Sequence, residues 1–249
     1  MRLQEAADAL GVHYQTAYAW VRAGRLPARK VGRGYQVAEA DVRALAADRG
    51  RGSEPPGVVR VRDWPAQSAR LYQAIVTGQE TAARAVAGRL AGRIPVTDLC
   101  DRIIAPALRR VGDEWAAGRV SVAREHRATA ICERLLAASA RPAAGPPRGT
   151  AVVATPPGER HGMPALMAAA CLRQHRWQVH HLAADLPAAE IAGLAAQVGA
   201  RLVVLSTATA DGARSAAAAA DLIRSASPAA TVLTGRSGDT LADLLARAG

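Results

Sequence analysis

The stretch TAVVATPPGERHG, residues 150–162, decides the fold of the C-terminal part of the chain. A short apolar run ends in a Pro-Pro-Gly turn, and the helical spacing of Pro164–His175 follows it. Three further apolar runs alternate with helical stretches in the same way: VHHLA (179–183), RLVVLS (201–206) and TVLTG (231–235). Strands buried on both faces have this composition. The pattern predicts an open parallel sheet with helices on both sides over residues 150–249.

The middle of the chain has a different periodicity. Apolar residues recur at spacings of three and four through residues 66–140, for example in Leu71-Ile75, Val86-Leu90, Leu99-Ile103 and Ile131-Leu135. This spacing is typical of amphipathic helices. Four helices with short connections predict a four-helix bundle over residues 66–141.

The N-terminal segment combines two short helices with a hairpin. Apolar spacing predicts a helix over Gln4–Leu10 and a second one over Tyr14–Arg22, separated by Gly11 and stopped by Gly24. The next stretch, ARKVGRGYQV (28–37), alternates around a Gly-Arg-Gly turn as a two-stranded wing does, and helical spacing resumes at Glu39. We therefore predict a winged helix-turn-helix domain over residues 1–50, a compact design for docking on duplex DNA.

Two stretches rich in Pro and Gly divide the chain. They are RGSEPPG (51–57) and RPAAGPPRGT (141–150), and both residue types disfavour the interior of helices and strands. We predict linkers at residues 51–65 and 142–149. The chain is thus expected to be a multi-domain protein with a winged helix-turn-helix head, a helical bundle and a parallel-sheet domain.

Composition limits the class of protein. Half of the 249 residues are apolar, enough for cores in two or three domains, which excludes a disordered tail protein. The net charge of +11, carried almost entirely by arginine since Lys30 is the only lysine, favours a polyanionic partner. No apolar run approaches the ~18 residues of a membrane span, and the start MRLQEAADALGVH lacks the order of a signal peptide. We expect a cytoplasmic protein without a membrane partner.

The head offers candidate DNA contacts. On a helix that begins near Tyr14, the side chains of Gln15, Tyr18 and Arg22 would face outward, while Arg29, Lys30 and Arg33 would neutralise phosphates beside the wing. The motif AAxxLGV (6–12), followed by YxWVxxGRLP (18–27) and the wing, resembles the helix-turn-helix domain of MerR and excisionase-type regulators. The resemblance implies a double-stranded DNA operator as partner. Alternatively, the arginines are solvated surface residues, or the fold docks protein.

A second group of candidates surrounds the turn after the first strand of the sheet. His161 lies at the edge where parallel sheets bind ligands, and its neutral imidazole is a donor to transition metals. Glu159 can accept the other ring N–H and fix the tautomer. Taken alone, such a loop histidine is more often a surface residue. The bundle adds Trp115, followed by the pair Glu125-His126.

Together these residues resemble cobalamin-binding modules, in which a helical bundle lies over the upper face of the corrin and a flavodoxin-like (Rossmann-type) sheet supplies Asp-x-His-x-x-Gly. The histidine of that motif replaces the dimethylbenzimidazole of the cofactor on cobalt. Carried over, the resemblance makes His161 the lower cobalt ligand supported by Glu159. It implies further cofactor contacts at Trp115, Glu125 and His126 in the bundle, and at Ser206, Thr207 and Gly235 around the nucleotide tail.

With its head, the whole chain resembles light-responsive, adenosylcobalamin-dependent repressors of the CarH and LitR type. The resemblance implies adenosylcobalamin as cofactor, a homo-oligomer (dimer or tetramer) that binds DNA in the dark, and no enzymatic activity. Three positions depart from the pattern: Glu159 replaces Asp, Pro164 replaces Gly, and Ala116 stands where light-sensing members have a second cobalt-binding histidine. Ala116 has no donor atom, so a bis-histidine photoproduct formed at that position is excluded.

Other interpretations stay open. The same modules occur in corrinoid-carrying proteins of methyltransferase systems, although the chain is expected to lack room for a catalytic domain. A regulator that senses the level of cobalamin, or another tetrapyrrole, without a light response is a further alternative. Cys171 and His175, near His180 and His181, could suggest zinc, but we expect a core cysteine and partly exposed histidines. Cys100, Cys132 and Cys171 lie too far apart to indicate a disulfide framework.

Overall fold

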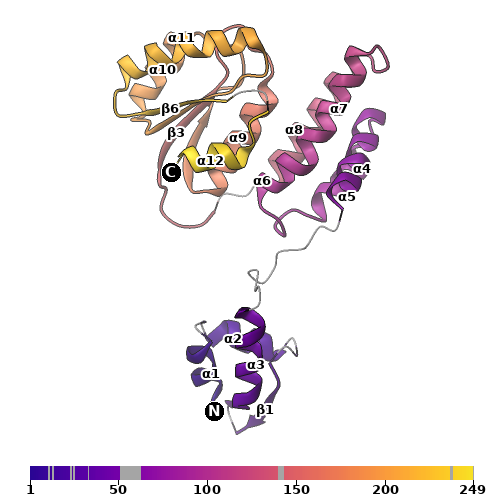
Figure 1. Cartoon of the computed structure of the whole chain (residues 1–249), viewed down its shortest axis with the longest axis vertical. Helices are drawn as coiled ribbons and strands as arrows, with labels where there is room; N and C mark the ends of the chain where they lie inside the picture. The colour runs from indigo at the N-terminus through magenta and orange to yellow at the C-terminus, as the bar shows by residue number, and fades with distance from the viewer. Residues whose placement is uncertain are drawn as a thin grey trace. The chain divides into compact units, whose positions relative to one another are not determined.

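The computed structural model describes residues 1–249 except Gly11, His13, Ala23, Arg25, Arg33 and the ranges 51–62, 140–142, 236–237 and 249, with the backbone alone at 46–50. The chain divides into two compact units, Met1–Val58 and Val59–Gly249 (Figure 1). Most of the predicted first linker, and the first residue of the second, lie outside the described residues.

The first unit has the expected elements. Helices α1 (Leu3–Ala9) and α2 (Tyr14–Arg22) precede an antiparallel hairpin of β1 (Ala28–Val31) and β2 (Gly34–Val37), and α3 (Glu39–Gly50) follows it. A small core holds them together, formed by Leu3, Ala6, Ala7, Leu10, Ala17, Trp20, Leu26, Val37, Val42 and Leu45. The prediction of a helix-turn-helix domain with a wing is confirmed.

The second unit begins with the helical bundle. Its helices are α4 (Trp64–Thr77), α5 (Glu80–Gly88), a composite helix and α8 (Val122–Ser139). The composite helix runs without a break through α6 (Val96–Leu99), a π-helical turn η1 (Cys100–Ile104) and α7 (Ala105–Ala116). Helix α4 begins two residues before the predicted start of the bundle, because the carboxylate of Asp63 caps it by accepting a hydrogen bond from Ala66 N at 2.9 Å.

The sheet of the second unit is parallel throughout, with the order β4-β3-β5-β6. Its strands are β3 (Gly149–Ala154), β4 (Trp177–His181), β5 (Leu202–Leu205) and β6 (Thr231–Thr234). Helices α10 (Ala188–Gln197) and α11 (Ala210–Ala226) pack on one face, and α9 (Gly162–Gln174) and α12 (Leu241–Ala248) pack on the other (Figure 1). The predicted three-layer α/β domain is confirmed.

Helix α9 joins the bundle to the sheet. Met163, Met167 and Cys171 belong to the core of the bundle, while Ala165 and Leu172 pack against the sheet. Three hydrogen bonds also link the bundle to α9 and α12: Val96 N donates to Gln174 Oε1 at 2.8 Å, and Leu241 N donates to both carboxylate oxygens of Asp101 at 3.1 Å. The bundle is therefore packed along α9 and hydrogen-bonded to the last residue of α9 and the first residue of α12.

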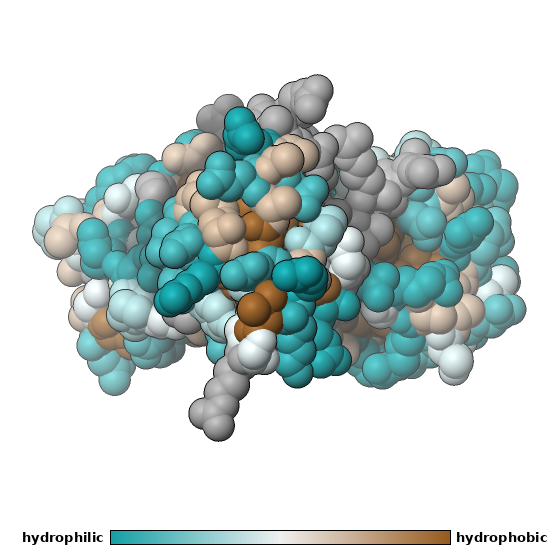
Figure 2. All heavy atoms as spheres, turned by 90° about the horizontal axis from the view of Figure 1, so that it is seen from below, coloured by the Kyte–Doolittle hydropathy of each residue, from teal (hydrophilic) through white to brown (hydrophobic). Residues whose placement is uncertain are grey.

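The surface is mixed. The face in Figure 2 is largely hydrophilic, and its hydrophobic residues gather in small separate patches. Within the described part of the chain, no helix combines the length and apolarity needed to span a bilayer.

Candidate functional site

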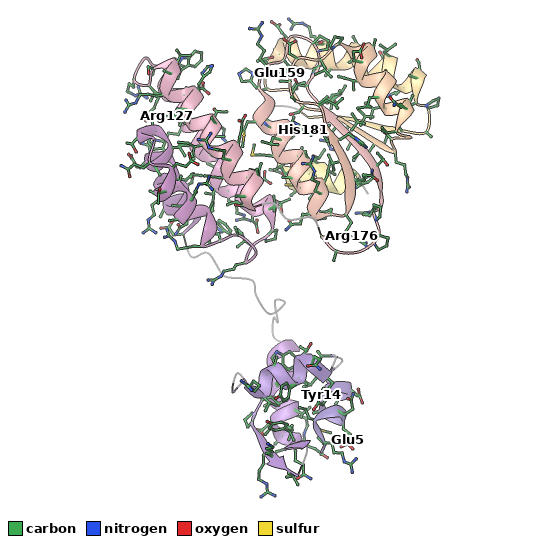
Figure 3. The ribbon with its side chains drawn as sticks, turned by 180° about the vertical axis from the view of Figure 1, so that it is seen from behind. Glu5, Tyr14, Arg127, Glu159, Arg176 and His181 are labelled. Atoms are coloured by element: carbon green, nitrogen blue, oxygen red, sulfur yellow. The ribbon has the colours of Figure 1, made fainter. Side chains whose placement is uncertain are left out.

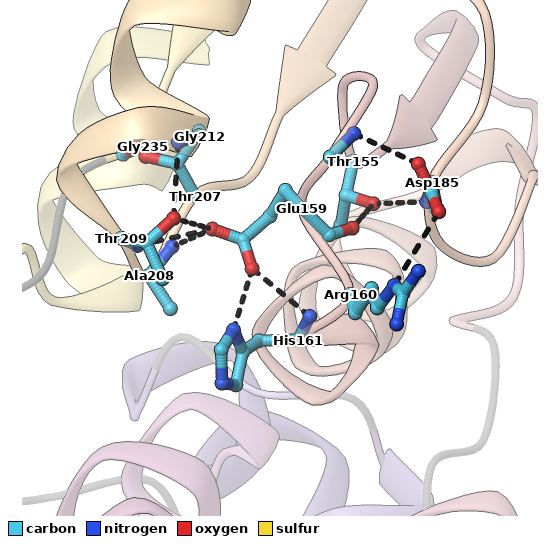
Figure 4. A network of polar contacts seen from close by, with 11 residues as sticks. Thr155, Glu159, Arg160, His161, Asp185, Thr207, Ala208, Thr209, Gly212 and Gly235 are labelled. Atoms are coloured by element: carbon cyan, nitrogen blue, oxygen red, sulfur yellow. Dashed lines mark hydrogen bonds and ion pairs between the residues drawn. The ribbon is translucent and has the colours of Figure 1, made fainter.

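Glu159 connects two loops at the carboxyl edge of the sheet (Figure 4). Its side chain is fully buried, in the turn between β3 and α9. Oε1 accepts hydrogen bonds from His161 N at 3.0 Å and from His161 Nδ1 at 2.6 Å. Oε2 accepts three more, from Ala208 N at 2.8 Å, Thr209 N at 3.0 Å and Thr209 Oγ1 at 2.9 Å. One carboxylate thus holds the His161 turn against the loop that follows β5.

The charge state of Glu159 decides the tautomer of His161. Burial raises the pKa of Glu159, but the hydrogen bonds from the His161 backbone, Ala208, the His161 ring and Thr209 outweigh it and lower the pKa to about 2. The group is therefore ionised at neutral pH and can only accept. The proton of a neutral His161 ring then lies on Nδ1, which leaves the lone pair on Nε2. Because 62% of the side chain is exposed, Nε2 is accessible to a ligand.

The loop between β4 and α10 supports the same turn. Thr155 Oγ1 donates to Glu159 O at 2.6 Å and accepts from Asp185 N at 2.7 Å, and Asp185 Oδ1 accepts from Gly158 N at 2.8 Å. Ala183 and Asp185 have φ of 60°, a left-handed conformation that is unfavourable for residues with a side chain. Backbone strain of this kind persists where surrounding contacts fix it, often at functional sites.

The bundle residues of the candidate site lie where α7 ends and α8 begins. Trp115 is 51% exposed, in the last turn of α7. In the first turn of α8, His126 Nδ1 lies 2.7 Å from Glu125 Oε2 and 3.0 Å from Val122 O. Thr129 Oγ1 donates to Glu125 Oε1 at 3.0 Å. Figure 3 places Arg127, the residue after His126, and Glu159 at the same end of this unit.

The candidates after β5 and β6 are adjacent. Ser206 and Thr207 are buried, and Thr207 Oγ1 donates to Gly235 O at 2.6 Å. Gly235 N donates to Leu205 O at 2.9 Å. A side-chain carbon on Gly235 would lie 3.9 Å from its nearest neighbours, which is ordinary contact, so packing alone does not demand glycine there.

Three polar residues of this region were not predicted from the sequence: Thr155, Asp185 and Thr209. Thr209 belongs to the run Ser206-Thr-Ala-Thr209 directly after a buried strand, so the hydroxyl-rich composition was a usable signal. Asp185 carries no such signal, because it reaches Gly158 and Thr155 only through the pairing of β3 with β4.

The head presents its DNA-contact candidates on two elements. Gln15 and Arg22 are exposed on α2, and Tyr18 is half-buried, with its ring 5.7 Å from that of Tyr35 in the wing. The hairpin separates the two cations of β1. Lys30 pairs with Tyr35 and shares its face, whereas Arg29 pairs with Gln36 on the opposite face. The remaining candidate, Arg33, lies outside the described residues.

A separate groove of about 440 Å³ lies between α4 and the η1–α7 helix. None of the residues predicted to contact the corrin lines it; its walls are Trp64, Pro65, Ser68, Ala69, Tyr72, Arg102, Pro106, Ala107 and Arg110. Cys171 is buried in the bundle core, and His175 Nδ1 lies 2.9 Å from its carbonyl oxygen. Within the described residues, no three His, Cys, Asp or Glu side chains converge as metal ligands.

Comparison with known families matches each part of the chain. A helix-turn-helix domain model matches residues 1–50, and two B12 binding domain models match residues 67–139 and 149–248. The chain combines a helix-turn-helix domain with B12-binding domains. The first B12-binding domain corresponds to the bundle from α4 to α8, and the second to the parallel sheet with its helices.

The chain is similar in sequence to one known repressor and in fold to one solved corrinoid protein. The HTH-type transcriptional repressor CarA of Myxococcus xanthus is 36% identical over 110 residues, which are 43% of this chain and 36% of the repressor. This chain therefore spans little more than a third of the length of that relative. The monomethylamine corrinoid protein of Methanosarcina barkeri has a TM-score of 0.54 and 16% identity, over 70% of this chain and 86% of that one. It shows the fold of the B12-binding domains alone.

Proposed function

We propose that this protein is a transcriptional regulator whose binding to double-stranded DNA depends on adenosylcobalamin and responds to light through oligomerisation. The observation that carries the proposal is the Glu159–His161 pair in a chain that also has a helix-turn-helix head. A B12-binding domain without the head would fit a carrier of methyl groups equally well.

The residues of the site fit a corrinoid. A lower axial ligand of cobalt needs a neutral nitrogen donor that is held in one orientation and open on its outer side. His161 meets these conditions, because Glu159 binds Nδ1 and leaves the exposed Nε2 free. We assign His161 as the lower ligand and Glu159 as the residue that orients it.

The remaining candidate residues would line the cofactor-binding site. Trp115 is half-exposed and would offer its aromatic surface to the upper face of the macrocycle, and the Glu125-His126 pair would supply polar atoms beside it. Ser206, Thr207 and Gly235 line the strand ends where the nucleotide tail would enter. When bound with an adenosyl upper ligand, the cofactor supplies a cobalt–carbon bond that light can break.

Oligomerisation would couple the two ends of the chain. One small head makes few phosphate contacts, so its affinity for an operator is low, and joining two or four heads multiplies those contacts. A cofactor that stabilises the oligomer raises DNA affinity without touching DNA. Since Ala116 has no metal-binding atom, the illuminated state lacks a cobalt ligand from that position.

The test is to incubate the purified chain with adenosylcobalamin in the dark, remove free cofactor, and record the absorbance spectrum and the size by gel filtration before and after illumination. We expect retained corrin and a larger species in the dark that becomes smaller in the light. The matched control is His175→Ala, which removes a histidine of the same domain outside the site. Retention without a change on illumination would instead indicate a sensor of cobalamin level. No retention by the wild type would refute the proposal.

A further inference from the structure

The amino edge of the parallel sheet carries three exposed arginines, at the end opposite the candidate site. Each stands immediately before a strand: Arg176 before β4, Arg148 before β3 and Arg201 before β5. Figure 3 shows Arg176 and Glu159 at opposite ends of the sheet. We propose that this arginine row binds the phosphate backbone of DNA, as a second contact surface outside the head. The inference rests on the proposed function, since it assumes that the head binds duplex DNA.

The strand order places these arginines side by side. Strands β4, β3 and β5 are neighbours in the sheet, so the residues that precede them lie along one edge. Arg148 N donates to Arg176 O at 2.8 Å, and Arg201 N donates to Thr150 O at 2.9 Å. Neighbouring strands are about 4.8 Å apart, so the backbones of the two outer arginines are separated by about 10 Å. Long side chains on such a row form a strip that an extended polyanion can follow.

Two of the arginines are held in place around Gly149. A side-chain carbon at Gly149 would lie 2.9 Å from Arg201 Cδ and 3.1 Å from Trp177 Cζ3, so only glycine leaves room for both. Arg201 crosses the strand end there, and its Nη1 donates to Arg148 O at 2.9 Å. The guanidinium carbon of Arg148 lies 6.0 Å from the centre of the Trp177 ring. These contacts keep the Arg148 and Arg201 side chains at the edge of the sheet.

The positive charge of the row has no acidic partner nearby. Among the residues that the structure describes, none of the three guanidinium groups forms an ion pair with a carboxylate. Asp221, near the end of α11, pairs with Arg224 at 2.8 Å. The loops that lead into the four strands contain neither Asp nor Glu; they are residues 143–148, 175–176, 198–201 and 227–230. The edge therefore keeps its charge, and most of its N–H donors, for a partner.

The helices that end at this edge do not neutralise the row. Helices α9, α10 and α11 each lead back to the start of the next strand, so their C-terminal carbonyl groups lie at the amino edge. A helix C-terminus carries about half a negative elementary charge, which gives about 1.5 for the three helices. The arginines supply three full positive charges, so the edge stays positive.

A DNA backbone suits this row better than a single small anion. A guanidinium group binds phosphate oxygens through two parallel N–H bonds, and phosphates recur along a DNA strand, so each arginine of the row can contact its own phosphate. Once bound to an operator, the head of the same chain raises the local concentration of DNA, so a weak second surface is enough to contribute. The cofactor candidates lie at the other edge of the sheet, and both sites can therefore be occupied together.

The test uses the full chain and a labelled duplex of about 60 bp, with binding measured by fluorescence anisotropy from about 50 to 200 mM salt. One variant replaces Arg148, Arg176 and Arg201 with alanine, and a second replaces the same three with lysine, which keeps the charge. The matched control is a triple alanine variant of three exposed cations that pair with carboxylates three or four residues away, namely Arg84, Arg102 and Arg214. Circular dichroism and gel filtration verify that each variant keeps the fold and size of the wild type.

The quantity compared is the salt slope, the fall in log affinity per unit rise in log salt concentration. Three phosphate contacts predict that the alanine variant lowers this slope by about 2.7, so that the wild type loses about 40-fold more affinity than the variant over this range. The lysine variant should keep most of the slope, and the control should keep all of it.

A wild-type slope in the alanine variant would overturn the inference and leave the role of the head intact. An equal fall in the control, or a lysine variant with the slope of the alanine variant, would overturn it too, because neither follows from phosphate contacts at this edge. If the wild-type chain binds no duplex, the proposed DNA-binding function fails as well.

Discussion

Replacing Glu159 with glutamine tests the reasoning about the site without any cofactor. The carboxylate accepts five hydrogen bonds, two at Oε1 and three at Oε2. Glutamine keeps an acceptor at one end and places an NH₂ donor at the other. Either the two donors of His161 or the three donors of Ala208 and Thr209 then lose their partner.

The size of the effect follows from the pKa of the carboxyl group. Lowering it from 4.5 to about 2 in the folded protein corresponds to roughly 3 kcal/mol of stabilisation at neutral pH. Hydrogen bonds to charged groups contribute about 1.5–3 kcal/mol each, so the loss of two gives a similar value. We expect the free energy of unfolding of Glu159→Gln to be about 3 kcal/mol lower than that of the wild type.

The pH dependence has a definite sign. Because the pKa of Glu159 is lower in the folded chain than its ordinary value of 4.5, the stabilisation is complete above about pH 4.5 and is lost as the pH falls toward 2. Glutamine does not titrate, so this contribution is absent from the variant at every pH. The difference in stability between wild type and variant should therefore narrow in that window.

The assay is thermal unfolding of the cofactor-free chain, followed by circular dichroism at several pH values. A loss of about 3 kcal/mol in a unit of this size lowers Tm by roughly 6–12 °C at neutral pH. Glu190→Gln is the matched control: it removes the same charge from an exposed residue in the first turn of α10, where about 0.5 kcal/mol or less is expected. Equal stability of the two variants, or a difference that does not change between pH 5 and pH 2.5, would refute the reasoning.

Four further predictions concern single residues. His161→Ala should keep the fold, since the ring is largely exposed, but lose cobalamin on gel filtration; full retention would remove His161 as the ligand. Arg22→Ala should reduce the salt slope of duplex binding by about 0.9, and an unchanged slope would argue against a phosphate contact. The hydrogen bonds from Arg134 and then Arg84 lower the pKa of Glu80 to about 2, so the link between α5 and α8 should weaken as the pH falls from 4.5 toward 2; Glu80→Gln should abolish that part of the acid sensitivity in denaturant titrations. Burial, followed by the charge of Glu133, raises the pKa of Cys132 to about 12, so its thiol should resist alkylation at pH 8 until the chain unfolds, and rapid labelling of the native protein would contradict this.

Hydrophobic periodicity, together with the Gly and Pro residues between segments, predicted the helices and strands because each helix or strand buries one face or both. The first residues of the helices were less predictable, since a capping side chain accepts a hydrogen bond from the backbone N–H three residues further along. Asp63 starts α4 two residues early, and Thr209 Oγ1 likewise caps the start of α11 by accepting a hydrogen bond from Gly212 N at 3.0 Å.

For the candidate site, the decisive factor was distance along the chain. Glu159 and His161 could be paired from sequence because they are two residues apart. The partners of Glu159 in the loop after β5 lie about fifty residues further on. Only the parallel pairing of β3 with β5 brings that loop to the carboxylate, so no local pattern could have identified Thr209 as its partner.

Helix α9 belongs to two hydrophobic interiors, and it starts one residue after His161. Turning this helix by one residue, about 100°, would move Met163 and Met167 out of the bundle and expose apolar surface on both sides. The imidazole thus belongs to the residue that precedes a helix whose packing on both sides prevents it from rotating freely. A displacement of the backbone at position 161 would therefore either move the residues of α9 that pack in the bundle, Met163 and Met167, or break their contacts.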